Sequence, residues 1–96
     1  MNYFQLNFNL PFDKAIEDLR TDKNRKIITY SNNYFILYAL FSGDIIDDYQ
    51  NRPVTDEGKS IYNIKARVWD LQNRFGIDIS RERDAEGNFM KYWIER

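Results

Sequence analysis

The chain has 96 residues, which is enough for one domain and too few for two independent cores. It contains no cysteine and no histidine, so disulfides, thiolate or imidazole metal sites and a histidine general base are excluded. With 14 basic and 15 acidic residues, its net charge of −1 counts against binding nucleic acid through bulk charge alone. We therefore expect a protein that is not an enzyme and holds no metal or cofactor.

Hydropathy and the distribution of charge further limit the class of protein. No apolar run approaches the roughly 20 residues needed to span a bilayer, and the opening residues lack the features of a signal peptide. We expect a cytoplasmic protein with no membrane partner. Residues 1–58 carry an excess of acids and residues 59–96 an excess of bases, so the basic side chains concentrate toward the second half.

The N-terminal part predicts a strand and a short helix. Residues 4–10 alternate apolar and polar side chains, the period of a half-buried strand, and Pro11 ends that pattern. Phe12, Ile16 and Leu19 then recur at helical spacing, which predicts an amphipathic helix over residues 12–20. A basic connection follows, and it is either a solvated loop or a loop that contacts phosphates. Its cations are Arg20, Lys23, Arg25 and Lys26.

Residues 27–42 are strongly apolar and admit two interpretations. One is a buried helix with Ser31 or Asn32 as its N-cap, ending at Gly43. The other is a pair of β-arms joined by a tight turn at residues 32–33. Apolar residues on all sides, with a glycine directly behind them, favour the helix. In either case the segment belongs to the core.

Residues 44–58 are the most polar stretch and predict a loop, with at most one short turn at residues 45–49. Asp44, Asp47 and Asp48 lie close together in this stretch, but they lack the spacing that wraps calcium. We expect them to be solvated acids.

The clearest helix signal covers residues 60–75. Its apolar stripe consists of Ile61, Ile64, Val68, Leu71 and Phe75, spaced three and four residues apart. Ser60 is a suitable N-cap, and Gly76 stands where a helix C′ residue belongs. The period changes to two after Gly76, with turn residues at 84–88 and renewed alternation at 89–94, which predicts a β-hairpin.

Residues 61–79, IYNIKARVWDLQNRFGIDI, resemble a small phage and prophage helix-turn-helix family. That family has an Ala-Arg-Ile/Val-x-Asp-Leu-Arg-x-x-Gly signature at the end of its recognition helix, followed by an isoleucine-rich strand. The resemblance implies a single α+β domain: a winged helix-turn-helix over residues 27–96, with residues 1–26 as an N-terminal strand-helix addition. Two features depart from the family. Gln72 replaces a basic residue, and the loop at 44–58 stands where a short second helix is expected.

In this architecture the outer face of the helix enters a DNA major groove and the hairpin, or wing, lies along the phosphates. Asparagine can read adenine, arginine can read guanine or hold phosphate, and hydroxyls position the backbone. The expected contacts to double-stranded DNA on the helix face are Lys59, Ser60, Asn63, Arg67 and Arg74. Those flanking the wing are Arg81, Arg83 and Lys91.

Other interpretations of the same residues stay open. Arg67 and Asp70 could form an ordinary exposed ion pair. For Trp69 and Trp93, a position in the core or facing a partner is favoured over stacking on bases. An alternative role of the charged hairpin tip is to prevent edge-to-edge pairing of the sheet. The net charge, the acidic loop and the 17% aromatic content fit an alternative function. This is a phage-encoded protein-interaction module that inhibits a host defence system or host enzyme in the host cytoplasm. A homodimer or a structural role in a particle is also compatible with the sequence.

Overall fold

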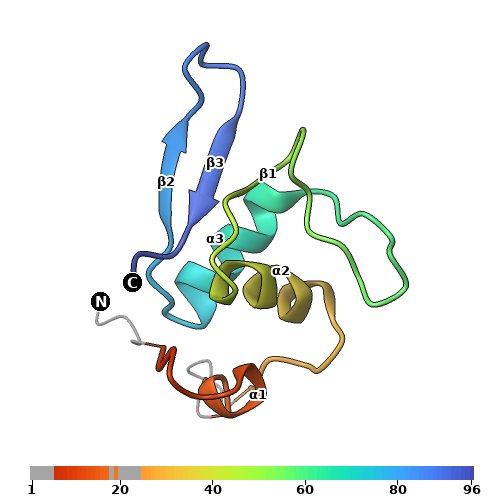
Figure 1. Ribbon diagram of the computed structural model, residues 1–96, viewed down its shortest axis with the longest axis vertical. Coiled ribbons are helices and arrows are strands. Elements are labelled where there is room, and N and C mark those ends of the chain that lie inside the picture. Colours follow the sequence, from red (N-terminus) through yellow and green to blue (C-terminus); the bar gives the residue numbers. More distant parts are fainter. Residues whose placement is uncertain (1–5, 18, 20–24) are drawn as a thin grey trace.

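Three helices and three short strands make up the part of the chain that the computed structural model describes, namely residues 6–17, 19 and 25–96 (Figure 1). In chain order they are α1 (Phe12–Ala15), α2 (Asn32–Phe41), β1 (Ile46–Asp47), α3 (Ile64–Arg74), β2 (Ser80–Arg83) and β3 (Met90–Trp93). The strands form one antiparallel sheet in the order β1-β3-β2. The class is therefore mixed α+β, and none of the described helices is long and apolar enough to cross a membrane.

The expected N-terminal strand is wrong where the structure describes it. Residues 6–10 form a turn, in which the Leu10 N–H donates to the Asn7 carbonyl at 3.1 Å and the Asn9 N–H donates to the Asn7 side chain at 3.0 Å. The Phe8 ring stacks on the Phe41 ring of α2, with 5.0 Å between their centroids. Alternation at these positions thus reflects aromatic packing on a helix rather than strand pairing. Residues 4 and 5 lie outside the described residues.

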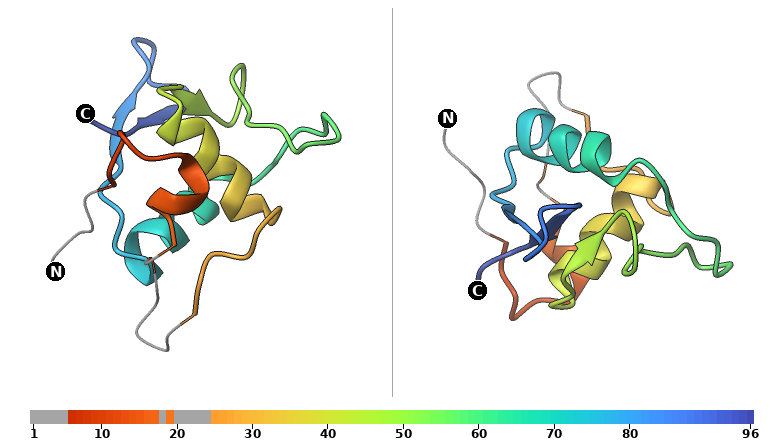
Figure 2. Two further views of the ribbon diagram at one scale, coloured as in Figure 1. Left: turned by 60° about the horizontal axis from the view of Figure 1, so that its bottom comes forward. Right: turned by 90° about the horizontal axis from the view of Figure 1, so that it is seen from above.

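The helix expected at residues 12–20 is present but short. α1 is one turn of four residues, and Phe12, Ile16 and Leu19 are buried as the spacing predicts. Phe12 packs edge-on against Tyr34 and Tyr38, so α1 lies against α2 (Figure 2). Residues 18 and 20 lie outside the described residues. Of the basic connection, only residues 25 and 26 are described, and both are exposed.

The helical interpretation of residues 27–42 is confirmed, and the hairpin alternative is wrong. The Ser31 hydroxyl accepts the Tyr34 N–H at 3.2 Å, which caps the start of α2. At the other end Gly43 adopts φ +95°, its N–H donates to the Leu40 carbonyl, and the Asp44 N–H donates to the Ala39 carbonyl. This is a Schellman motif, which a left-handed glycine makes possible.

The polar stretch after α2 holds a strand that sequence patterning missed. In β1, Ile46 pairs with Tyr92 and Asp47 with Lys91 of β3. Asp47 is only 1% exposed, so the expectation that it is solvated is wrong. Its Oδ1 accepts the backbone N–H groups of residues 49, 50 and 51 at 2.7, 2.6 and 3.0 Å. Asp44 and Asp48 are exposed, as expected.

The helix predicted at residues 60–75 begins later than its pattern indicated. α3 starts at Ile64 behind Asn63, which has φ +60°, so Ser60 is not the N-cap. Ser60 instead forms an isolated β-bridge with Val54, and the Ile61 N–H donates to the Pro53 carbonyl at 2.9 Å. This pairing holds residues 60–61 extended. The apolar stripe is nevertheless buried along its whole length.

The register of the hairpin decides which way its charged side chains point. Arg81 pairs with the buried Tyr92, and Arg83 pairs with Met90. Because opposite residues in a pair share one face of a sheet, Arg81 and Arg83 lie on the face of Tyr92. Lys91 is offset by one residue from Tyr92 and therefore lies on the other face.

Candidate nucleic-acid interface

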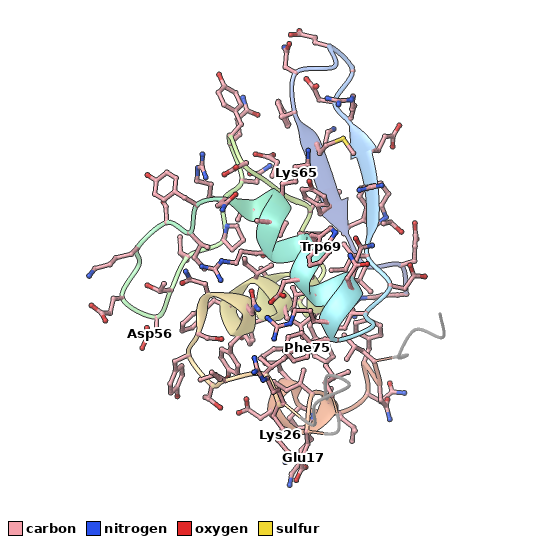
Figure 3. All side chains as sticks on the ribbon, turned by 180° about the vertical axis from the view of Figure 1, so that it is seen from behind. Glu17, Lys26, Asp56, Lys65, Trp69 and Phe75 are labelled. Carbon is pink, nitrogen blue, oxygen red and sulfur yellow. The ribbon has the colours of Figure 1, made fainter. Side chains whose placement is uncertain are left out.

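The solvent face of α3 lies beside the hairpin (Figure 3). Lys65 is in the first turn of the helix and Trp69 in its middle, and both are exposed. Trp69 is 60% exposed, so a core position for this ring is wrong. Asn63 precedes the helix, is exposed, and makes no capping bond with its side chain.

A cleft of about 290 Å³ separates this helix face from the sheet. Asn63, Lys65, Trp69 and Arg81 line it, with Tyr92 among them. Burial raises the pKa of Tyr92, although the nearby guanidinium of Arg81 acts in the opposite direction. Two of the predicted contact residues, Asn63 and Arg81, are therefore brought together here.

Gln72 also borders this cleft, and it has a structural role. Its Nε2 donates to the carbonyl of Ile79 at 2.8 Å, which ties α3 to the chain entering β2. The Gln72 side chain thus links the helix to the hairpin.

The opposite flank of α3 carries the other predicted arginines. Arg67 and Arg74 line a second cleft of about 290 Å³ between α3 and the start of α2, together with Arg25 and Lys26. The Asp70 carboxylate accepts the side-chain amide of Asn33 at 2.8 Å and pairs with Arg74 at 3.3 Å. The alternative pairing of Arg67 with Asp70 is therefore not formed.

Several cations without a carboxylate partner among the described residues lie on α3 and on the adjoining face of the hairpin. Within the described part of the chain, Lys65, Arg67 and Arg81 form no ion pair with a carboxylate. Arg83 lies on the same face as Arg81, and its guanidinium donates to the Gly87 carbonyl at 3.4 Å. Lys65 and Arg81 thus line the cleft on one flank of α3, and Arg67 lies on its other flank.

Three predicted contact residues lie elsewhere. Lys59 and Ser60 belong to the loop before α3 and not to the helix face, and Lys59 pairs with Glu57 at 3.7 Å. Asp56 marks this loop in Figure 3, well away from the hairpin. Lys91 is on the opposite sheet face and close enough to Asp84 to help lower the pKa of that carboxyl.

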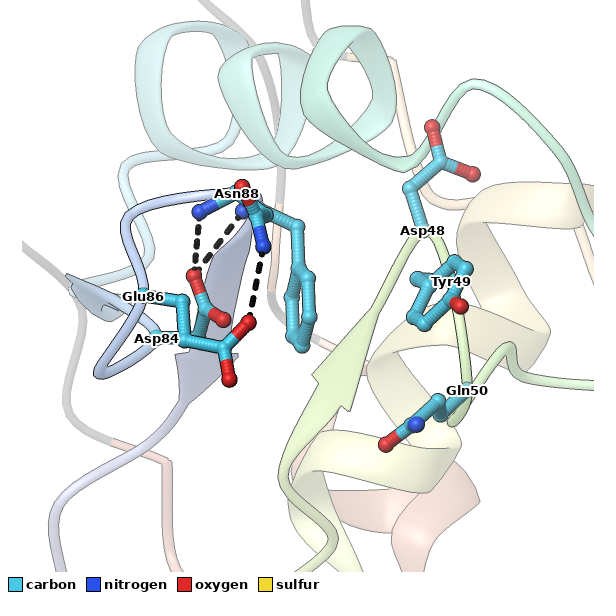
Figure 4. Close-up of a pocket in the computed structure, with 7 residues that line it drawn as sticks. Asp48, Tyr49, Gln50, Asp84, Glu86 and Asn88 are labelled. Atoms are coloured by element: carbon cyan, nitrogen blue, oxygen red, sulfur yellow. Dashed lines mark hydrogen bonds between the residues drawn. The ribbon is translucent and has the colours of Figure 1, made fainter.

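The tip of the hairpin is acidic and faces the turn after β1 (Figure 4). A cleft of about 730 Å³ there is lined by Asp48, Tyr49, Gln50, Asp84, Glu86, Asn88 and Phe89. Asp84 accepts the backbone N–H groups of Asn88 and Phe89 at 2.5 and 3.1 Å, and these bonds outweigh desolvation and lower its pKa. The described residues contain no cluster of side chains suited to a metal ion.

Comparisons with family models, curated proteins and solved structures found no match. The arrangement of the side chains is therefore the basis for a functional argument. Sequence patterning overlooked Lys65 and Ala66, which line the cleft between α3 and the hairpin. Their position opposite the apolar stripe of α3 was the signal that could have found them, because that side of the helix must face solvent.

Proposed function

We propose that this is a winged-helix protein that binds double-stranded DNA through the solvent face of α3 and the Arg81 face of the hairpin. The order α2, β1, α3, β2, β3 and the strand order β1-β3-β2 support this fold. Residues 48–63 contain no helix, so a loop precedes α3 in place of the first helix of a helix-turn-helix. The protein would act as a regulator or accessory factor of phage or mobile-element type in the host cytoplasm.

The observation that carries the proposal is that Lys65 and Arg81 line one cleft beside the exposed side of α3, with Arg67 on the other flank of the helix. Arg83 lies farther along the Arg81 face of the hairpin. α3 has 11 residues, which gives a rod about 16 Å long that fits a major groove about 12 Å wide. The exposed Asn63 amide can pair with an adenine edge, and the hairpin arginines can hold the flanking phosphates. The acidic tip would stay away from the backbone.

Titration of a fluorescent DNA duplex by anisotropy tests this function. At low salt (about 50 mM) we expect Arg81→Ala to weaken binding roughly tenfold and to lower the salt slope by about 1. Lys91→Ala is the matched control, since it removes one cation from the same hairpin but from the other face. Equal losses for both variants, or no duplex binding by the unaltered protein, would overturn the proposal.

A second candidate function is a protein-interaction module that inhibits a host defence system or host enzyme. Exposed aromatic rings favour it, because Tyr30, Tyr49, Tyr62 and Trp69 are each at least 60% exposed. Nuclease treatment of the protein together with a co-purified partner distinguishes the two functions. A partner protein that stays bound after nuclease treatment supports the second candidate, and its release by nuclease supports DNA as the bridge.

A further inference from the structure

A fourth cleft, which the DNA-binding proposal does not use, lies between α2 and the loop carrying residues 52–56. It has a volume of about 480 Å³. Tyr30, Tyr34, Phe35 and Tyr38 supply its aromatic wall, and Pro53 and Val54 face them. Figure 3 shows Asp56 on this loop, beside α2. We call this site the aromatic cleft.

The rings of the aromatic cleft form one connected surface. Tyr30 meets Tyr34 edge-on at 5.5 Å and stacks on Phe35 at 5.9 Å, measured between ring centroids. Tyr30 is 67% exposed and Tyr38 is 51% exposed, so two ring faces are open to solvent. Tyr30 also has φ +64°, a left-handed backbone conformation that is costly for an aromatic residue and is found preferentially at functional sites.

Two of the tyrosine hydroxyls in the aromatic cleft are available as donors. The Tyr34 hydroxyl is already committed, because it donates to the Asp13 carboxylate at 2.7 Å, and burial with this bond raises the pKa of Tyr34 to about 12. The hydroxyls of Tyr30 and Tyr38 form no hydrogen bond with any residue that the structure describes. They can therefore donate to the carbonyl groups of a ligand.

The charge of the aromatic cleft is negative. Asp44 and Asp56 line it and form no ion pair within the described residues. Arg52 also lines it, but its guanidinium is held by Asp48 and lies 4.2 Å from the centroid of the Tyr62 ring. The ligand should therefore bring a cation.

We propose that the aromatic cleft binds a proline-rich segment of a partner protein, with an arginine or lysine beside the prolines. A polyproline II segment has no internal hydrogen bonds, so its carbonyls are free to accept from tyrosine hydroxyls. Proline rings pack on exposed aromatic faces, and proline has no N–H that would need an acceptor in the cleft. The neighbouring cation meets Asp44 and Asp56. This site does not depend on DNA binding by α3.

Amide NMR spectra of the full chain titrated with a blocked proline-rich peptide, with arginine at each end, test the inference. We expect shift changes centred on Tyr30, Tyr38, Val54 and Asp56. Tyr38→Ala should weaken peptide binding about tenfold. Tyr49→Ala is the matched control, because Tyr49 is as exposed as Tyr30 but lies in the turn after β1, opposite the hairpin tip, and it should leave the affinity unchanged.

A charge reversal tests the cation without disturbing the aromatic wall. Asp56 lies in an exposed turn. Asp56→Lys should weaken binding of the peptide that has arginine at its ends, and it should strengthen binding of the same peptide with glutamate at its ends. Equal binding of both peptides to the unaltered protein would overturn the inference. So would the absence of shifts at these residues, or shifts there on adding duplex DNA but not the peptide.

Discussion

Asp47 is a buried carboxylate that organises the turn after β1. Burial disfavours its charge, but the backbone N–H groups of Asn51, Tyr49 and Gln50 outweigh that effect and lower the pKa of Asp47. The Asp47 N–H also donates to the Asn51 carbonyl at 3.1 Å, so the turn is closed from both sides. One side chain thus fixes the path of the chain as it leaves the sheet.

Replacing this carboxylate should be costly. Asp47→Ala leaves three N–H groups without their acceptor, and we expect a loss of about 2–3 kcal/mol in the free energy of unfolding by urea at pH 7. Because the folded-state pKa is lowered, the contribution of Asp47 is present above the ordinary aspartate pKa of about 3.9 and is lost as pH falls below it. The variant should therefore lose less stability on acidification. Asp78→Ala, an exposed carboxylate, is the control, and an equal loss there would refute this role.

At the scale of elements, the ends of α2 follow from local chemistry. Gly43 lies at φ +95°, and a Cβ at that position would be 3.7 Å from the Arg96 guanidinium, which is an ordinary contact. The cost of Gly43→Ala is therefore conformational, and we expect about 1 kcal/mol of destabilisation by thermal unfolding. Gly43→Asn should cost less, because asparagine tolerates the left-handed region. The reverse ranking would contradict the Schellman interpretation.

Elements with strong periodicity and caps were predictable, and those shaped by tertiary pairing were not. Ser31 and Gly43 delimit α2 as expected, whereas β1 is only two residues long and lies among acids, so no pattern marks it. The Phe4–Leu10 alternation misled because Phe8 packs on Phe41. Ile61 continues the α3 stripe, yet its bond to Pro53 keeps it out of the helix.

The candidate site, too, was only partly predictable from the sequence. The arginines of α3 and β2 were found by residue type, but their faces depend on register. The sequence did place Met90 and Tyr92 on one side of the last strand, and that alternation already puts Lys91 on the other. The prediction that grouped Lys91 with Arg81 and Arg83 did not take this alternation into account. The aromatic cleft joins residues from α2 and a distant loop, so no local pattern could reveal it.

At the scale of the whole molecule, Arg96 joins segments that are far apart in sequence. Its guanidinium lies 4.5 Å from the centroid of the Phe8 ring and donates to the Phe41 carbonyl at the end of α2. We expect Arg96→Ala to destabilise the protein by about 1 kcal/mol and to increase hydrogen exchange around Phe8 and Phe41. Glu95→Ala is the neighbouring control. Unchanged exchange at both phenylalanines would show that the contact contributes nothing.

The β1-β3-β2 order has a consequence for how the protein is made. The middle strand, β3, is the last of the three to leave the ribosome. β1 therefore stays unpaired until its partner is translated, more than 40 residues later. Until then α2 and the apolar stripe of α3 can associate, while both outer strands have nothing to pair with. Completion of the sheet is thus a late step governed by contacts of long sequence separation. A nascent chain stalled before Met90 would hold the helices but not the hairpin.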